Sequence, residues 1–101
     1  MLVRFQSGAP RYMKVVNKYK EKYTHYIGRR SVFGNPFVID EDGTRAEVIE
    51  KYEEYARGNL KLRGVIRDLP ESAVLGCFCK PKKCHGDVIL KIWEEYNPPM
   101  V

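Results

Sequence analysis

One short segment of the sequence concentrates the side chains that most often bind metal or take part in catalysis. It runs from Cys77 to Asp87 and reads Cys-Phe-Cys-Lys-Pro-Lys-Lys-Cys-His-Gly-Asp, which includes all three cysteines of the chain. Thiolate sulfur and imidazole nitrogen are typical zinc ligands, and a thiol beside an imidazole is also a common nucleophilic pair. We therefore expect the chemistry of the protein in this segment.

The first interpretation is a structural zinc site with the ligands Cys77, Cys79, Cys84 and His85. Three cysteines and one histidine are a suitable donor set for tetrahedral zinc. The spacing is unusual, because common zinc modules join two ligand pairs from distant segments. Adjacent residues on a helix, such as Cys84 and His85, also point about 100° apart.

The second interpretation is catalytic, with Cys84, His85 and Asp87 as the reacting groups. At a helix N-terminus beside Lys82 and Lys83, the pKa of the Cys84 thiol would be lowered. His85 would serve in acid–base chemistry because an imidazole titrates near neutral pH. The segment has neither a Cys-x5-Arg arrangement nor a Cys-x-x-Cys redox pair.

Two further interpretations need no reactive thiol. In one, the helix N-terminus binds a phosphate or nucleotide, and Cys77 and Cys79 are packing residues. In the other, the cysteines only fill the core while His85 and Asp87 cap the helix. This last reading suits Cys77 best and Cys84 least, since Cys84 follows a lysine-rich turn. All four interpretations stay open at this point.

A second candidate ligand site is the loop from Gly28 to Phe37, which contains two glycines and an Asn-Pro pair. Arginine offers paired donors to phosphate oxygens, and serine adds a hydroxyl. The residues that we assign to phosphate or ligand binding are Gly28, Arg29, Arg30, Ser31 and Asn35.

The elements that must position these residues follow from pattern and turn signals. Thr44 with Glu47 forms a capping box at the start of a helix that Gly58 ends, and Asn59 can cap a second helix. The apolar run 72–79 is typical of a strand buried on both faces. We expect strands near 13–17, 24–27 and 72–79, and helices over 45–57, 60–69 and 84–96.

This order predicts an α/β fold, a small single-domain sandwich with a three- or four-stranded sheet and about three helices packed on it. The 101 residues suffice for one domain, which we place at 13–101 after an N-terminal extension, 1–12. No apolar run approaches the ~20 residues of a membrane span. The three clustered cysteines favour reduced thiols, so we expect a soluble cytoplasmic protein.

Charge is distributed unevenly along the chain. Residues 1–30 carry eight Lys or Arg against one Glu, whereas the other 71 residues hold ten basic and twelve acidic side chains. A basic N-terminal third can attract phosphate groups, so we expect a nucleotide or nucleic acid as partner. Tyr19 and Tyr23, which alternate with lysines, could stack on bases.

The two candidate segments together resemble a known family. The motifs are Tyr26-Ile27-Gly28-Arg29, Gly34-Asn35-Pro36-Phe37, Asp42-Gly43-Thr44-Arg45, Gly76-Cys77-Phe78-Cys79 and Cys84-His85-Gly86-Asp87-Val88. They are similar to the domain of unknown function 4326 of phages and prokaryotes, from about Met13 to Tyr96. The resemblance implies a small stand-alone cytosolic domain, often virus-encoded, in which loop 28–37 and segment 77–87 form one site. It supplies no activity.

The leading hypothesis is therefore a nucleotide- or nucleic-acid-directed binding protein or enzyme. Its site would combine the 28–37 loop with Cys84, His85 and Asp87. The main alternative is a non-enzymatic, zinc-stabilised binding module that acts on nucleic acid or a protein partner. A third option is a virus-encoded protein that acts only by binding a host partner.

Overall fold

Three short strands form a parallel sheet in the order β1-β3-β2. The structure, a computed structural model, describes residues 13–98. Strand β1 spans Lys14–Asn17, β2 spans His25–Tyr26, and β3 spans Val74–Cys77. The central strand is β3, and its residues Leu75, Gly76 and Cys77 are buried. Its nearly unbroken apolar sequence fits a strand that is covered on both faces of the sheet.

The connection from β1 to β2 has to pass over β3, and Gly76 makes this crossing possible. A Cβ atom at Gly76 would lie 2.6 Å from Cγ of Tyr23, so the missing side chain leaves room for the tyrosine ring. The connection is also tied to the sheet, since Thr24 N–H donates to the Val74 carbonyl at 2.8 Å. The segment between β1 and β2 is therefore held close against the central strand.

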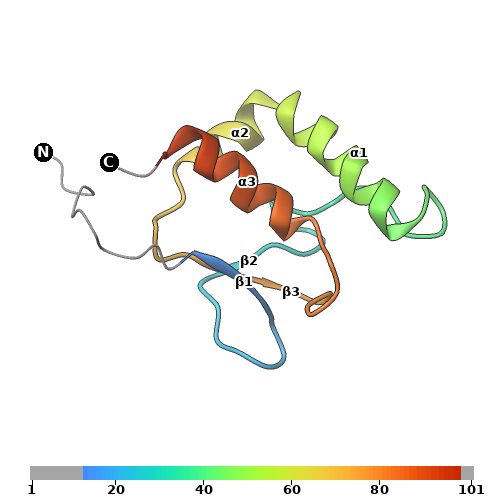
Figure 1. Cartoon of the computed structure of the whole chain (residues 1–101), viewed down its shortest axis with the longest axis horizontal. Coiled ribbons are helices and arrows are strands. Elements are labelled where there is room, and N and C mark those ends of the chain that lie inside the picture. Colours follow the sequence, from blue (N-terminus) through green and yellow to red (C-terminus); the bar gives the residue numbers. More distant parts are fainter. Residues whose placement is uncertain (1–12, 99–101) are drawn as a thin grey trace, which may run out of the picture.

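Three helices lie on one side of the sheet (Figure 1). They are α1 at Arg45–Arg57, α2 at Leu60–Arg67, and α3 at Gly86–Tyr96. The capping box at Thr44 and Glu47 is confirmed, with Thr44 Oγ1 accepting from Glu47 N–H at 3.2 Å. Asn59 caps α2, since its Oδ1 accepts from Leu62 N–H at 3.1 Å.

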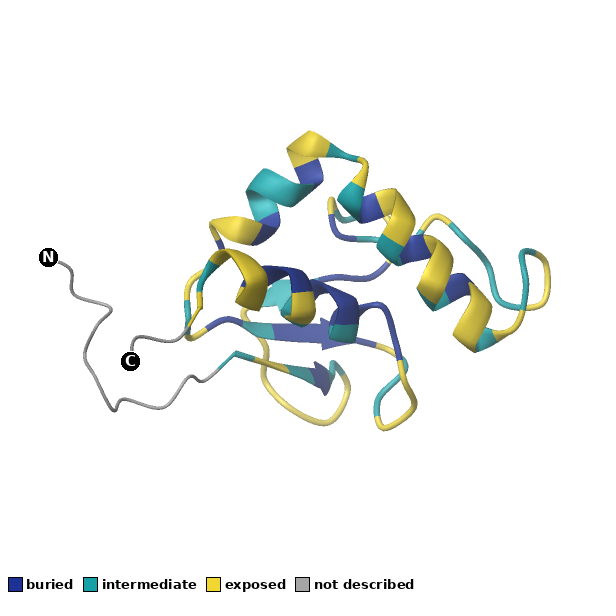
Figure 2. Cartoon of the chain, turned by 45° about the horizontal axis from the view of Figure 1, so that its top comes forward, coloured by how far each residue is buried: buried dark blue, intermediate teal, exposed yellow. Residues whose placement is uncertain are grey.

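The core lies between the helices and the sheet, where the buried residues in Figure 2 face one another. Helix α3 presents Val88, Ile89, Ile92 and Trp93 to this core, as its apolar spacing predicts. At its first residue, Gly86, a Cβ atom would lie 2.8 Å from a Val15 methyl carbon. Glycine therefore lets the start of α3 approach the sheet closely.

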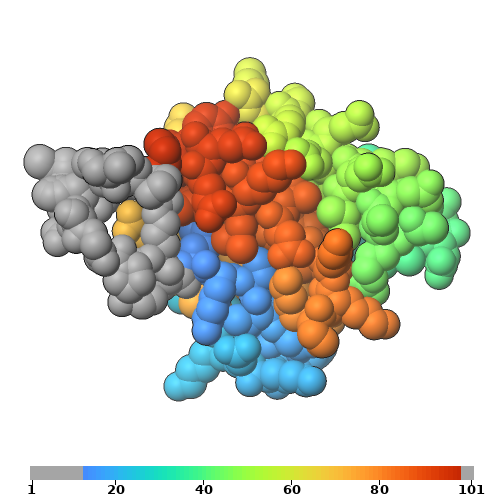
Figure 3. Space-filling model, viewed as in Figure 1, coloured from blue at the N-terminus to red at the C-terminus, as the bar shows by residue number. Residues whose placement is uncertain are grey.

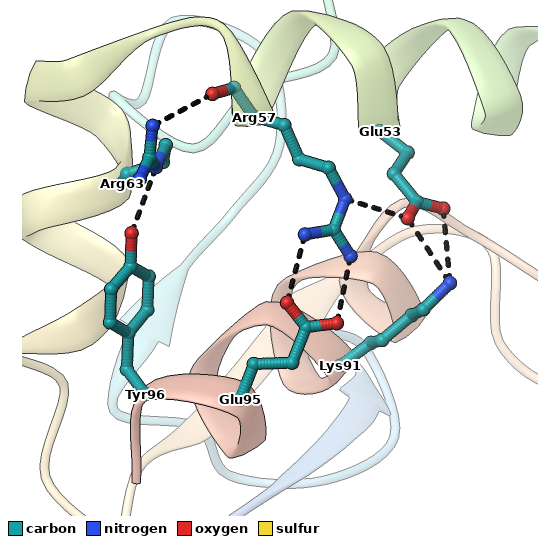
Figure 4. Close-up of polar contacts among 6 residues, drawn as sticks. All are labelled: Glu53, Arg57, Arg63, Lys91, Glu95 and Tyr96. Atoms are coloured by element: carbon teal, nitrogen blue, oxygen red, sulfur yellow. Dashed lines mark hydrogen bonds and ion pairs between the residues drawn. The ribbon is translucent and has the colours of Figure 1, made fainter.

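A charged network on the outer side joins the helices (Figure 4). Its members are Glu53, Arg57, Arg63, Lys91, Glu95 and Tyr96. Arg57 donates to both carboxylate oxygens of Glu95, at 2.8 and 2.9 Å, and to Glu53 at 2.8 Å. This bidentate pairing of Arg57 with Glu95 connects α1 to α3 at the edge of the apolar core.

The predicted fold class is confirmed, with three strands and three helices in the described chain. Some details differ. Helical spacing places Tyr55 on the same face as Val48 and Tyr52, and Tyr96 on the same face as Ile92 and Trp93, yet both tyrosines are exposed. The last helix begins at Gly86, two residues later than predicted. The proposed extension 1–12 lies outside the described residues, and within the described part no helix is long and apolar enough to span a membrane.

Candidate functional site

A pocket of about 280 Å³ lies beyond the carboxyl ends of β2 and β3. Its wall comes from three segments that are far apart in sequence: residues 28–39 after β2, residues 45–49 at the start of α1, and residues 77–85 between β3 and α3. Ligand sites in open α/β sheets commonly occur at this position. The fold thus brings the 28–37 loop and the cysteine–histidine segment together around one cavity.

The pocket combines apolar walls with basic residues. Arg29, Arg45 and Lys83 line it, and no Asp or Glu does. None of the three forms an ion pair within residues 13–98. Arg45 is also held in place, since its Nη1 donates to the Lys83 carbonyl at 3.0 Å. Three uncompensated cations around an apolar cavity create a positive potential that favours an anionic ligand.

The side chain of His85 is buried at the wall of this pocket, with 9% of its surface exposed. Its Nε2 lies 2.7 Å from the Ile27 carbonyl, and its ring meets Tyr52 edge-on. A carbonyl only accepts, so Nε2 carries the proton and Nδ1 of the neutral ring keeps a free lone pair. Burial lowers the pKa of His85 and keeps the ring neutral at physiological pH.

No hydrogen-bond partner of His85 Nδ1 occurs within the part of the chain that the structure describes. A buried acceptor without a partner is costly and calls for a donor. The Nδ1 lone pair of His85, a residue that lines the pocket, is therefore available to a hydrogen-bond donor.

The cysteines are arranged differently from what the sequence suggested. Cys77 and Cys84 are both buried, with their sulfur atoms 3.4 Å apart, while Cys79 is half-buried. Burial raises the pKa of the Cys84 thiol to about 12, which is opposite to the lowered pKa that we expected. The reason is that the Cys84 side chain is buried against Cys77, and this burial outweighs the hydrogen bond that its Sγ accepts from Gly86 N–H at 3.3 Å. A nucleophilic role for Cys84 stays a prediction, without support from its pKa.

A zinc ion would need the four predicted ligands to converge. Only Cys77 and Cys84 meet, and the Nε2 of His85 already binds a carbonyl. Across residues 13–98, no group of three or more Cys, His, Asp or Glu side chains is placed to hold a metal ion. As arranged, the side chains do not fit a Cys3His site, so we derive no step through zinc. The Cys3His zinc site therefore stays a prediction, which a measurement of the zinc content would test.

Asp87 lies outside the pocket and has two structural contacts. Its Oδ1 pairs with Lys80 Nζ at 2.9 Å, and its Oδ2 accepts from Cys84 N–H at 3.4 Å. A carboxylate of the protein thus occupies the start of α3, where we considered a ligand phosphate. None of these contacts reaches the His85 ring, and α3 has no side-chain hydrogen bond at its N-cap, so Asp87 acts at the start of α3 as an acidic residue in the first turn.

The loop residues also divide into two groups. Gly28, Arg29 and Asn35 line the pocket, whereas Arg30 and Ser31 do not. Ser31 Oγ donates to the Gly28 carbonyl at 2.6 Å, and Asn35 Nδ2 donates to the Val48 carbonyl at 3.2 Å. These polar side chains shape the loop, which leaves Arg29 as the loop residue best placed to contact a ligand.

Arg45 is the functional candidate that sequence reasoning missed. A signal was present, because a cation in the first turn of a helix faces the positive end of the helix dipole and is unfavourable there. Such a local conflict often marks a functional position. Lys83 had been considered only as a neighbour of Cys84, and its place beside Arg45 depends on the fold.

The fold and pocket define a small α/β protein. Its pocket lies at the carboxyl edge of a parallel sheet and has a mostly apolar wall with three basic side chains. Residues 12–95 match the family model for the domain of unknown function DUF4326, so the chain belongs to this family. It is also similar to the "Uncharacterized 12.4 kDa protein in nrdA-td intergenic region" of Enterobacteria phage T4, at 36% identity over 89 residues. That alignment covers 85% of this chain and 82% of the phage protein. No solved structure matches.

Proposed function

We propose that this protein binds a nucleotide, with the phosphate at the three cations and the base against the apolar wall. The observation that supports this most directly is the pocket itself, in which Arg29, Arg45 and Lys83 come from three separate segments and no carboxylate is present. The paired donors of a guanidinium suit the planar geometry of phosphate oxygens, and Arg29 makes no side-chain hydrogen bond to the described residues. Repulsion among the three charges would be relieved by an anion.

The size and walls of the pocket favour one nucleotide over a larger cofactor. A cavity of about 280 Å³ is just below the roughly 300–1,000 Å³ typical of ligand sites. Its apolar wall includes Phe37, Ile39, Ile49 and Phe78, which can pack against a base. His85 Nδ1 would then accept a hydrogen bond from the base or sugar.

Calorimetric titration with the four common nucleoside monophosphates tests the proposal, with nucleosides and inorganic phosphate as separate probes. We expect a nucleotide to bind more tightly than either fragment, because only the nucleotide contacts both the cations and the apolar wall. If no monophosphate binds at low ionic strength, the proposal is wrong.

Arg29→Gln is the sharpest variant for this test, because Arg29 is exposed and has no hydrogen bond or ion pair with the described residues. Losing one charge-assisted phosphate contact should weaken binding about tenfold. Lys61→Gln is the matched control, since Lys61 is an exposed cation on α2, which does not line the pocket. Equal affinity of the two variants would contradict the assignment of Arg29.

A catalytic role for Cys84, His85 and Asp87 stays a hypothesis, and we propose His85 as its strongest member. The neutral imidazole has a free lone pair at the wall of the pocket, as a general base requires. Incubation with each nucleotide that binds, followed by chromatography, tests for turnover. His85→Gln keeps a donor for the Ile27 carbonyl but cannot take up a proton, so it should bind the nucleotide and lose any turnover.

A further inference from the structure

A cluster of exposed aromatic rings lies beside the pocket. Tyr19 is 75% exposed and Phe78 is 49% exposed, with ring centroids 5.5 Å apart, and Tyr26 meets Phe78 edge-on at 6.0 Å. The Lys18 ammonium lies between 4.8 and 5.4 Å from all three ring centroids. We call Lys18, Tyr19, Tyr26 and Phe78 the aromatic platform. Contiguous exposed apolar groups rimmed by polar residues often mark an interaction site.

The platform is held firmly in place beside the pocket. Asn17 Nδ2 donates to the Lys80 carbonyl at 2.8 Å, while its Oδ1 accepts from Tyr19 N–H at 2.9 Å. Asn17 thus connects the β1–β2 segment to the loop after β3, and Figure 3 shows these two segments, blue and orange, side by side. The exposed rings therefore belong to an ordered surface.

Phe78 joins the platform to the pocket, since it lines the pocket and also contacts Tyr19 and Tyr26. A nucleotide bound in the pocket would have its chain neighbour within reach of the platform. The surface around the platform is basic. Lys18, Lys20 and Lys22 form no ion pair within residues 13–98, and Glu21, the one acid between them, is paired with Lys14 at 3.5 Å.

We propose that the nucleotide in the pocket is one unit of a single-stranded nucleic acid, whose adjacent base stacks on Tyr19 and Phe78 while Lys18, Lys20 and Lys22 contact the backbone. This inference rests on the proposed function. Exposed rings interleaved with unpaired cations are the usual means of binding single strands, because every base has a face that can stack. Bases in a duplex are already stacked on each other and have no free face for Tyr19.

Fluorescence anisotropy with an oligothymidylate of ~8 nucleotides, an RNA strand of the same length and their duplexes tests the inference. We expect a single strand to bind at least about tenfold more tightly than the mononucleotide, and binding to weaken steeply with salt. The DNA and RNA strands show which sugar is preferred. If a duplex binds as tightly as the single strand, the stacking platform is wrong.

The variant Tyr19→Ala separates the platform from the pocket, because Tyr19 does not line the pocket and its exposure makes misfolding no concern. It should weaken single-strand binding about tenfold, while Tyr19→Phe, which keeps the ring, should restore it. Leu60→Ala, at a comparably exposed position on α2, is the control. An oligonucleotide that binds no better than the mononucleotide would overturn this inference and leave the proposed function intact. Loss of both would overturn the proposed function as well.

Discussion

Two charged regions of the described structure use their charges in opposite ways. On the outer side of α1 and α3, Arg57 is bound by two carboxylates, and Lys91 is paired as well (Figure 4). At the pocket, Arg29, Arg45 and Lys83 have no carboxylate partner among the described residues. Both regions contain arginine and lysine, but only the first also contains carboxylates that pair with them.

The difference separates charges that serve the fold from charges that are available to a ligand. A paired charge has its field compensated nearby, whereas unpaired cations around a cavity add their potentials. The paired region should therefore control stability, and the unpaired region should control binding. Substitutions in each region test this division, beginning with His85, which contributes to both the core and the pocket.

Replacement of His85 should have the largest effect, because His85 belongs to the pocket and to the core. His85→Ala leaves a cavity beside Tyr52 and a buried Ile27 carbonyl without its donor. We expect the free energy of unfolding to fall by about 2–4 kcal/mol. Urea denaturation measures this loss. If the free energy of unfolding falls by less than about 1 kcal/mol, the contacts of His85 contribute little to stability.

The titration of His85 predicts how stability depends on pH. Burial lowers its pKa in the folded state, so the unfolded state binds more protons below about pH 6.5. The contribution of His85 to the free energy of unfolding should be constant above that pH. It should decline as the pH falls from about 6.5 toward the lowered pKa of the folded state. The decline is at most about 1.4 kcal/mol per pH unit. His85→Gln should remove it, and His25→Gln, at the other histidine, should not.

Arg57→Ala tests the paired region. It removes the contacts to Glu53 and Glu95 that connect α1 with α3, so the free energy of unfolding should fall by about 1 kcal/mol. The loss should shrink at high salt because the pairs are partly exposed. Nucleotide affinity should not change. A reduced affinity at unchanged stability would contradict the division between the two regions.

Arg29→Gln is the matching test of the unpaired region. Removing one of three like charges relieves repulsion among them. The free energy of unfolding should therefore stay equal or rise by a few tenths of a kcal/mol. The same variant should lose nucleotide affinity, which reverses the pattern expected for Arg57→Ala. A clear destabilisation would show that Arg29 has a structural role.

The cysteines should differ in reactivity even though they are close in sequence. Cys79 is half-buried, whereas Cys77 and Cys84 are buried, so a thiol reagent should modify Cys79 first. The pKa of about 12 keeps Cys84 protonated at neutral pH. Mass spectrometry of partly alkylated protein measures the order. Rapid alkylation of Cys84 would instead support its role as a nucleophile.

Metal removal should have the smallest effect. The thiols and the imidazole do not converge in the described structure, so a chelator should leave the unfolding temperature unchanged. Elemental analysis should then find far less than one zinc per chain. About one zinc per chain, lost together with the fold on chelation, would establish the Cys3His interpretation instead.

Local signals in the sequence determined most of the elements. The Thr44–Glu47 capping box, the Asn59 cap and the apolar stripe of α3 depend on residues within a few positions of one another. Both caps are confirmed, and so is the stripe apart from Tyr96. The apolar run 72–79 likewise predicted a buried strand, which the structure shows at Val74–Cys77. Such features are readable because their physical cause lies within one or two turns of the chain.

The roles of the candidate residues were decided by tertiary structure. The sequence placed Cys84 and His85 on a polar turn, yet packing against β3 and the Ile27 carbonyl buries both. Arg45 and Lys83, 38 residues apart, meet only because α1 and the loop before α3 border the same cavity. Spacing fixes which side chains share a face of one element. Which faces meet, and which charges remain unpaired, depends on contacts between distant segments that no local pattern encodes.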